Sequence, residues 1–165
     1  AYIMDEMMAK ERMQFIVVGT GEEKYENMLR YFEQKYPGKV KADIGYSEER
    51  AHRVYAGCDA FLMPSLFEPC GLSQMIAMRY GTLPIVRETG GLKDTVQAYN
   101  EYEQLGTGFS FANYNAHEMY HTIQYAMQVY YEHRKEWNNM AVRAMEQDFS
   151  WNSSAREYEK LYETL

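Results

Sequence analysis

The residues between Pro64 and Gln74 combine a carboxylate and a glycine in one short loop. Glu68 stands three residues before Gly71, and Gly71 opens a stretch whose apolar spacing predicts a helix. A glycine there lets a ligand approach the backbone closely, and free N–H groups at a helix start attract a phosphate. We therefore expect the N–H groups of Gly71, Leu72 and Ser73 to face a phosphate, and Glu68 to accept hydrogen bonds from a neutral sugar. A plain strand-to-helix turn is the alternative interpretation.

A second loop, from Arg87 to Asp94, carries a pair of glycines. Thr89, Gly90 and Gly91 lie at its centre, and glycines allow a sharp turn or a close approach to another backbone. We expect this loop to close over the same ligand from the side. A simple turn remains open as the alternative.

Both loops follow short apolar runs, and such runs alternate with amphipathic stretches along the whole chain. The apolar runs predict strands over 14–18, 40–44, 60–63, 83–86 and 108–111. The amphipathic stretches predict helices over 1–12, 25–36, 47–57, 71–80, 115–130, 137–147 and 153–165. This alternation predicts a doubly wound parallel sheet of Rossmann-like type, which binds ligands at the carboxyl ends of its strands.

Helical spacing also predicts which side chains are buried. In the helix over 71–80 the inward set is Leu72, Met75, Ile76 and Tyr80. In the helix after residue 115 the inward set is Met119, Ile123, Met127 and Tyr130. Ser47 and Asn115 are expected as N-caps, and Gly81 as the glycine that ends its helix.

Composition narrows the classes of function. The formal net charge of −7 disfavours a nucleic-acid or anionic-membrane surface. The apolar runs are too short to span a bilayer. Two cysteines, Cys58 and Cys70, give no disulfide framework and fit a reducing cytoplasm. With 165 residues, 46% of them hydrophobic, the chain is expected to form one domain with its own core.

One short motif matches the zinc-protease signature. His117 to His121 spells H-E-x-x-H, with both imidazoles on one helix face. The motif falls at the predicted helix start, where Asn115 and Glu118 match a capping pair. We interpret it as a cap, and expect no metal there.

A second motif suggests a dinucleotide. Gly19-Thr20-Gly21 follows the first strand, and Asp43 lies near the end of the second. Lys24 stands where a third glycine would complete the fingerprint, so the match is weak. An NAD-dependent oxidoreductase is kept as an alternative function.

The two glycine loops and their surroundings resemble bacterial glycogen synthases and plant starch synthases. The likeness rests on FLMPSLFEPCGLSQ and VRETGGLKDTV, with MIAMRYGTLPI between them and GYSEERAHRVYAGCDAFLMPS ahead. It implies a cytoplasmic, retaining GT-B glucosyltransferase that passes glucose from ADP-glucose to the non-reducing end of an α-1,4-glucan such as glycogen. It implies neither a metal ion nor another cofactor, and no nucleic-acid or membrane partner.

The resemblance also implies roles for single residues. Glu68 would hold the hydroxyls of the donor glucose, and Tyr46 would stack on the adenine. The glucose and pyrophosphate region would be lined by Cys70, Gly71, Leu72 and Ser73. A supporting loop would be formed by Thr89, Gly90 and Gly91. Many related transferases have a second glutamate at the position of Ile76, and its absence favours the glycogen synthase branch.

By the same resemblance, residues 1–165 form a single nucleotide-sugar-binding domain, the C-terminal half of a two-domain enzyme. The N-terminal acceptor domain would be missing, together with phosphate-binding Arg and Lys residues that the family carries upstream of Gln14. We therefore expect the chain alone to be inactive. The alternatives are a domain that binds a nucleotide or glucan without catalysis, and a fragment of an NAD-dependent Rossmann oxidoreductase.

Overall fold

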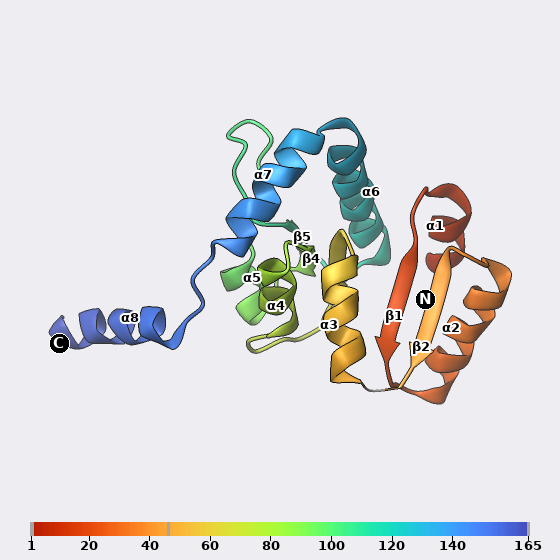
Figure 1. Ribbon diagram of the computed structural model, residues 1–165, viewed down its shortest axis with the longest axis horizontal. Coiled ribbons are helices and arrows are strands. Elements are labelled where there is room, and N and C mark those ends of the chain that lie inside the picture. Colours follow the sequence, from red (N-terminus) through yellow and green to blue (C-terminus); the bar gives the residue numbers. More distant parts are fainter. Residues whose placement is uncertain (1, 46, 165) are drawn as a thin grey trace.

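A computed structural model describes residues 2–45 and 47–164 (Figure 1). The strands are β1 (Phe15–Gly19), β2 (Val40–Ile44), β3 (Ala60–Met63), β4 (Leu83–Arg87) and β5 (Phe109–Phe111). The helices are α1 (Met4–Lys10), α2 (Glu23–Lys35), α3 (Glu48–Gly57), α4 (Ser73–Arg79), α5 (Gly90–Thr95), α6 (Ala116–Glu132), α7 (Arg134–Met145) and α8 (Trp151–Glu163). Strands and helices alternate as far as β5, and three helices follow.

The strands form two parallel sheets. In one, β1 pairs with β2, with Phe15 opposite Val40. In the other the order is β3-β4-β5, with Met63 opposite Val86. Over the described residues no strand pairing joins the two sheets. The predicted class, parallel strands flanked by helices, is confirmed, but the strands form two sheets instead of the one doubly wound sheet that we expected.

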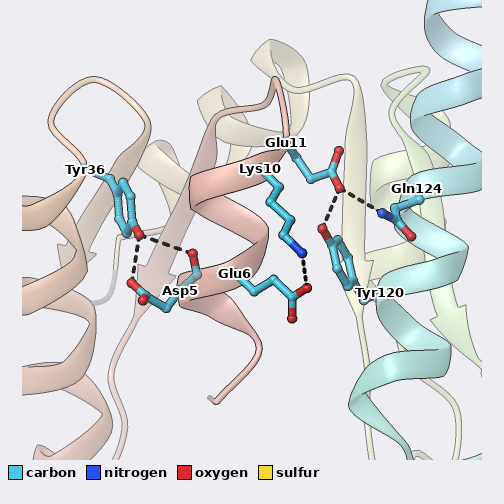
Figure 2. Close-up of polar contacts among 7 residues, drawn as sticks. All are labelled: Asp5, Glu6, Lys10, Glu11, Tyr36, Tyr120 and Gln124. Carbon is cyan, nitrogen blue, oxygen red and sulfur yellow. Dashed lines mark hydrogen bonds and ion pairs between the residues drawn. The ribbon is translucent and has the colours of Figure 1, made fainter.

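Helix α1 lies between α2 and α6, and hydrogen bonds join this part of the chain to residues on both sides (Figure 2). The Tyr36 hydroxyl, just after α2, donates to Asp5 Oδ1 at 2.8 Å. On the other side Glu11 Oε1 accepts from the Tyr120 hydroxyl at 2.5 Å and from Gln124 Nε2 at 2.9 Å. The apolar side of α1 is buried through Ile3, Met4, Met7 and Met8. Helix α1 therefore holds the β1–β2 half of the chain against the other half.

The best-buried strand is β4, which has a partner on each side. Leu83 and Val86 on β4 are fully buried. Phe109 of β5 stacks on Trp137 of α7, with 5.9 Å between the ring centroids. This half of the molecule thus carries a packed core directly beneath the loops that follow β3 and β4.

Two helices bury faces that differ from the predicted ones. On α4 the buried residues are Gln74, Ala77 and Met78, while the side chains of Leu72 and Tyr80 are 66% and 44% exposed. The prediction was wrong because α4 is short and a buried polar residue, Gln74, decides its orientation. On α6 the buried set is Tyr120, Ile123, Ala126 and Val129, and the predicted Met119, Met127 and Tyr130 are only partly buried.

The predicted caps Ser47 and Asn115 and the predicted terminal glycine Gly81 are confirmed. Ser47 accepts a hydrogen bond from the Arg50 N–H, and Asn115 accepts from the first N–H groups of α6. Gly81 has φ +78°, a left-handed conformation that favours glycine after a helix.

The last helix, α8, extends away from the other elements (Figure 1). It has no buried residue, and its Trp151 is 90% exposed. None of the helices in the described part of the chain is long and apolar enough to cross a membrane.

Candidate functional site

The loops that follow β3 and β4 touch through their backbones. The Gly91 N–H donates to the Pro69 carbonyl at 3.3 Å. A Cβ atom on Gly91 would lie 2.1 Å from the Cys70 carbonyl oxygen, and one on Gly90 would lie 2.0 Å from that of Glu68. Gly90 also has φ +44°. The glycine pair is therefore needed where it stands, because any side chain would force the two loops apart.

A buried amide fastens the first loop to both helices. Gln74 is fully buried, and its Nε2 donates to the carbonyls of Gly71 at 2.9 Å and Cys70 at 3.2 Å. The same nitrogen contacts Thr95 Oγ1 of α5 at 3.1 Å, and Thr95 in turn donates to the Gly91 carbonyl at 2.6 Å. The turn at Gly71, whose φ is +75°, is thus bonded to α4 and α5 together.

The sequence pattern predicted no role for Gln74 or Thr95. The signal was present, because Gln74, Ala77 and Met78 are spaced as one helix face. A polar residue on that face breaks the apolar pattern, and the pattern alone therefore favoured the neighbouring face. A buried glutamine beside a glycine turn indicates a loop whose carbonyls need a donor.

Arg87, the last residue of β4, fixes the start of the first loop. Its Nε donates to the Ser65 carbonyl at 2.9 Å and its Nη2 to the Leu66 carbonyl at 2.6 Å. Its Nη1 reaches the Ala112 carbonyl after β5 at 3.3 Å. One guanidinium therefore ties the segments that follow β3 and β5 to the end of β4. An arginine at the end of a buried strand could have suggested this role.

The remaining site residues surround this framework. Glu68 is half-buried, and its carboxylate has no hydrogen bond or ion pair with any residue of 2–45 or 47–164. Cys70 is exposed, and its Sγ lies 3.6 Å from the Gly71 carbonyl oxygen. Leu72 precedes α4, which has no side-chain N-cap, so polar N–H groups of its first turn are left for another acceptor.

Ser73, the first residue of α4, is half-buried beside this turn. Thr89 precedes α5, a helix that the sequence analysis treated as loop. The structure thus brings the predicted residues of 68–73 and 89–91 into one neighbourhood. Tyr46 lies outside the described residues, so its stacking role stays a prediction.

The H-E-x-x-H motif forms the beginning of α6. The Glu118 carboxylate accepts from the backbone N–H groups of Ala112 at 2.8 Å and Asn113 at 3.1 Å. It also accepts from the Asn113 side chain at 2.9 Å, and these bonds hold the pKa of Glu118 below its ordinary value. Both histidines are exposed. Within 2–45 and 47–164, no three His, Cys, Asp or Glu residues are grouped to hold a metal ion.

The acidic residue of the possible dinucleotide motif is already paired. Asp43, near the end of β2, forms an ion pair with Arg50 of α3. A ribose hydroxyl bound at this point would have to compete with Arg50 for the carboxylate. This pairing disfavours the NAD interpretation.

Known proteins of similar sequence match the whole of this chain. A family model described as "Glycosyl transferases group 1" matches residues 4–143. The glycogen synthase of Lachnospira eligens is 65% identical over 165 residues, which are 100% of this chain and 34% of that protein. The glycogen synthase of Lachnoclostridium phytofermentans is 56% identical over 163 residues, 99% of this chain and 34% of that protein. The chain thus spans about a third of the length of the curated relatives that it matches.

Solved structures show a related fold. The catalytic domain of starch synthase IV from Arabidopsis thaliana, bound to ADP and acarbose, has a TM-score of 0.80 and 36% identity. The match covers 92% of this chain and 32% of that one. The sucrose-phosphate synthase of Thermosynechococcus elongatus has a TM-score of 0.67 at 21% identity, covering 97% of this chain and 40% of that one. The second likeness concerns the fold alone.

Proposed function

Since this chain belongs to the group 1 glycosyl transferases, we propose that it is the nucleotide-sugar-binding domain of a glycogen or starch synthase. The whole enzyme would transfer glucose from ADP-glucose to the non-reducing end of an α-1,4-glucan with retention. The observation that carries the proposal is the 65% identity to a glycogen synthase along the full 165 residues. The bound ADP of the plant starch synthase supports the choice of nucleotide.

The geometry of the two loops supports one role for the Glu68 carboxylate and another for the backbone N–H groups within the donor site. The Glu68 carboxylate, free of partners among the described residues, is suited to accept hydrogen bonds from glucose hydroxyls. The N–H groups of Gly71, Leu72 and Ser73 are suited to the pyrophosphate. Cys70, which lies between these two groups in the sequence, would line the same pocket.

The chemical step would break the bond between the anomeric carbon and the phosphate oxygen and form a glycosidic bond to the oxygen of a glucan hydroxyl, whose proton leaves with the departing ADP. Negative charge then grows on the departing ADP. Fixed N–H groups stabilise such charge without having to reorient, provided that their loop is held rigidly. Gln74 and the contact between Gly91 and Cys70 supply that rigidity. The glucan would be held by the part of the enzyme beyond this domain, and the enzyme would work in the cytoplasm.

A chimera tests the proposal. In it, this chain replaces the 165 matching residues of the Lachnospira eligens glycogen synthase. We expect the chimera to transfer radiolabelled glucose from ADP-glucose to glycogen, with turnover in the range of roughly 1–10³ per second usual for enzymes. The 165-residue chain alone should release no ADP. A chimera that melts cooperatively but transfers no glucose from ADP-glucose would contradict the proposal, and UDP-glucose serves as the comparison donor.

A further inference from the structure

Hydrogen bonds connect the two glycine loops in a closed ring. The Gly91 N–H donates to the Pro69 carbonyl at 3.3 Å, and the Gly91 carbonyl accepts from Thr95 Oγ1 at 2.6 Å. Thr95 Oγ1 in turn accepts from Gln74 Nε2 at 3.1 Å, and the same nitrogen donates to the Cys70 carbonyl at 3.2 Å. Because Pro69 and Cys70 are consecutive residues, the ring begins and ends on the first loop.

The Thr95 hydroxyl sets the direction of the Gln74 amide within this ring. Its single proton is donated to the Gly91 carbonyl, so its oxygen is left to accept from Gln74. The nitrogen of the amide therefore faces Thr95, and the same nitrogen reaches two carbonyls of the first loop. Of these three acceptors Thr95 is the one on a separate element, since it is the last residue of α5. It thus anchors Gln74 to a part of the chain beyond its own loop and helix.

The carbonyls that Gln74 binds determine where two N–H groups point. Gln74 is fully buried, so the carbonyls of Cys70 and Gly71 are turned toward the interior. A trans peptide group is planar, and its N–H points opposite to its C=O. The Cys70 carbonyl shares its peptide group with the N–H of Gly71, and the Gly71 carbonyl shares its own with the N–H of Leu72. Both N–H groups are therefore turned away from Gln74.

A third N–H group follows the same rule. The Pro69 carbonyl is turned toward the Gly91 N–H, so the N–H of Cys70 points away from the second loop. None of the N–H groups of Cys70, Gly71 and Leu72 donates to another atom of residues 2–45 or 47–164. Successive N–H groups of this kind form a concavity that binds anions. Their alignment depends on carbonyls that are held from behind.

We propose that Thr95 is a positioning residue for the transfer of glucose, acting through Gln74 on the loop that would bind the pyrophosphate. It keeps the amide of Gln74 directed at the two carbonyls, and so keeps the N–H groups of Gly71 and Leu72 aligned with the departing ADP. Misaligned N–H groups stabilise the growing negative charge less well, which lowers kcat more than donor affinity. The inference rests on the proposed function for its ligand, whereas the ring of hydrogen bonds does not depend on it.

Paired substitutions in the chimera with the Lachnospira eligens enzyme test this role. Thr95→Val keeps the branched shape and removes the hydroxyl, whereas Thr95→Ser keeps the hydroxyl. We expect Thr95→Val to lose about 10-fold in kcat, the worth of roughly one hydrogen bond, with the KM for ADP-glucose within about twofold. Thr95→Ser should stay within about twofold of the parent chimera. Thr95→Val added to Gln74→Met should lower kcat no further than Gln74→Met alone, because Thr95 acts through Gln74.

Thr82→Val is the matched control. Thr82 is buried, and its hydroxyl donates to the Cys58 carbonyl at 2.9 Å and to the Tyr55 carbonyl. It immediately precedes β4, at the opposite end of the strand from the glycine loops. This variant should lower the melting temperature and keep kcat. Normal kcat in Thr95→Val, an equal loss in Thr82→Val, or additive losses in the double variant would each overturn the proposal.

A measurement on the 165-residue chain separates this inference from the proposed function. The carbonyl carbon resonances of Cys70 and Gly71, recorded by NMR, report the hydrogen bonds that these carbonyls accept. Both should move in Thr95→Val, return in Thr95→Ser and stay in place in Thr82→Val. Resonances that do not move in Thr95→Val would refute the inference whether or not the chimera is active. An inactive parent chimera would contradict the proposed function, and moved resonances would then still establish Thr95 as the residue that orients the loop.

Discussion

The contact between the two glycine loops can be broken by a single methyl group, in Gly91→Ala. The added Cβ would lie 2.1 Å from the Cys70 carbonyl oxygen, which is 1.3 Å short of the 3.4 Å where ordinary contact begins. It would also lie 2.6 Å and 2.7 Å from the Cα and carbonyl carbon of Cys70. All three atoms belong to the backbone, so no rotamer change relieves the clash, and one loop has to move by about 1 Å.

The size of the effect follows from that displacement. Overpacking of this kind costs about 1–3 kcal/mol, which lowers the melting temperature of a chain of this size by roughly 2–12 °C. A displacement of about 1 Å at a reacting centre costs roughly 100-fold in rate. We therefore expect Gly91→Ala in the chimera to lose about 100-fold in kcat, with the protein still folded at 25 °C.

The control is Gly57→Ala at the end of α3. A Cβ on Gly57 meets no atom within 4 Å, and alanine is the better helix former by about 1 kcal/mol. This variant should keep its kcat and its melting temperature, or gain slightly in the latter. The assays are glucose transfer by the chimera and thermal melting of the 165-residue chain. If Gly91→Ala retains kcat within about twofold of Gly57→Ala, the loop contact does not position the site, and our reasoning fails.

Three other substitutions address single contacts. Glu68→Gln should lower the kcat of the chimera by roughly 100-fold. The melting temperature should stay unchanged, because the carboxylate bonds to no described residue. Near-normal glucose transfer would show that Glu68 is not part of the donor site. Gln74→Met keeps the side-chain volume but removes the N–H donor that serves two carbonyls. It should lower the free energy of unfolding of the 165-residue chain, measured in urea, by about 1–3 kcal/mol. An unchanged urea midpoint would show that these hydrogen bonds are dispensable. Burial and the hydrogen bond to Glu11 raise the pKa of Tyr120 from 10.0 to about 12. The neutral phenol therefore stabilises the folded state fully below pH 10, and this stabilisation is lost as the pH rises toward 12. Tyr120→Phe should therefore flatten the fall of melting temperature over that range, and an equally steep fall would contradict this role.

Local patterns were enough to predict the strands and most helix ends. Strands β2 and β3 have the predicted bounds. Strand β3 is an apolar run between Asp59 and Pro64, and β2 alternates apolar with charged residues and is followed by Gly45. The caps Ser47 and Asn115 were found because a side chain that bonds the first N–H groups of a helix acts within a few residues. These features depend on interactions that the sequence itself places close together.

Features set by tertiary contacts were missed. Helix α5 begins with two glycines, which are poor helix formers, and it exists because Gly90 and Gly91 pack on the first loop. The buried face of α4 was assigned wrongly because the bonds of Gln74 to its loop outweigh the apolar spacing of its neighbours. In both cases the deciding partner lies outside the helix concerned, and for α5 it is about twenty residues away in the sequence.

The division of the sheet has a consequence for the proposed donor site. Glu68 and the glycine pair depend on the pairing of β3 with β4, which is complete within the described residues. Tyr46, proposed to stack on the adenine, follows β2 in the other sheet. The two ends of one nucleotide sugar would then be held by different sheets, connected here through α3 and the bonds of α1 to α6.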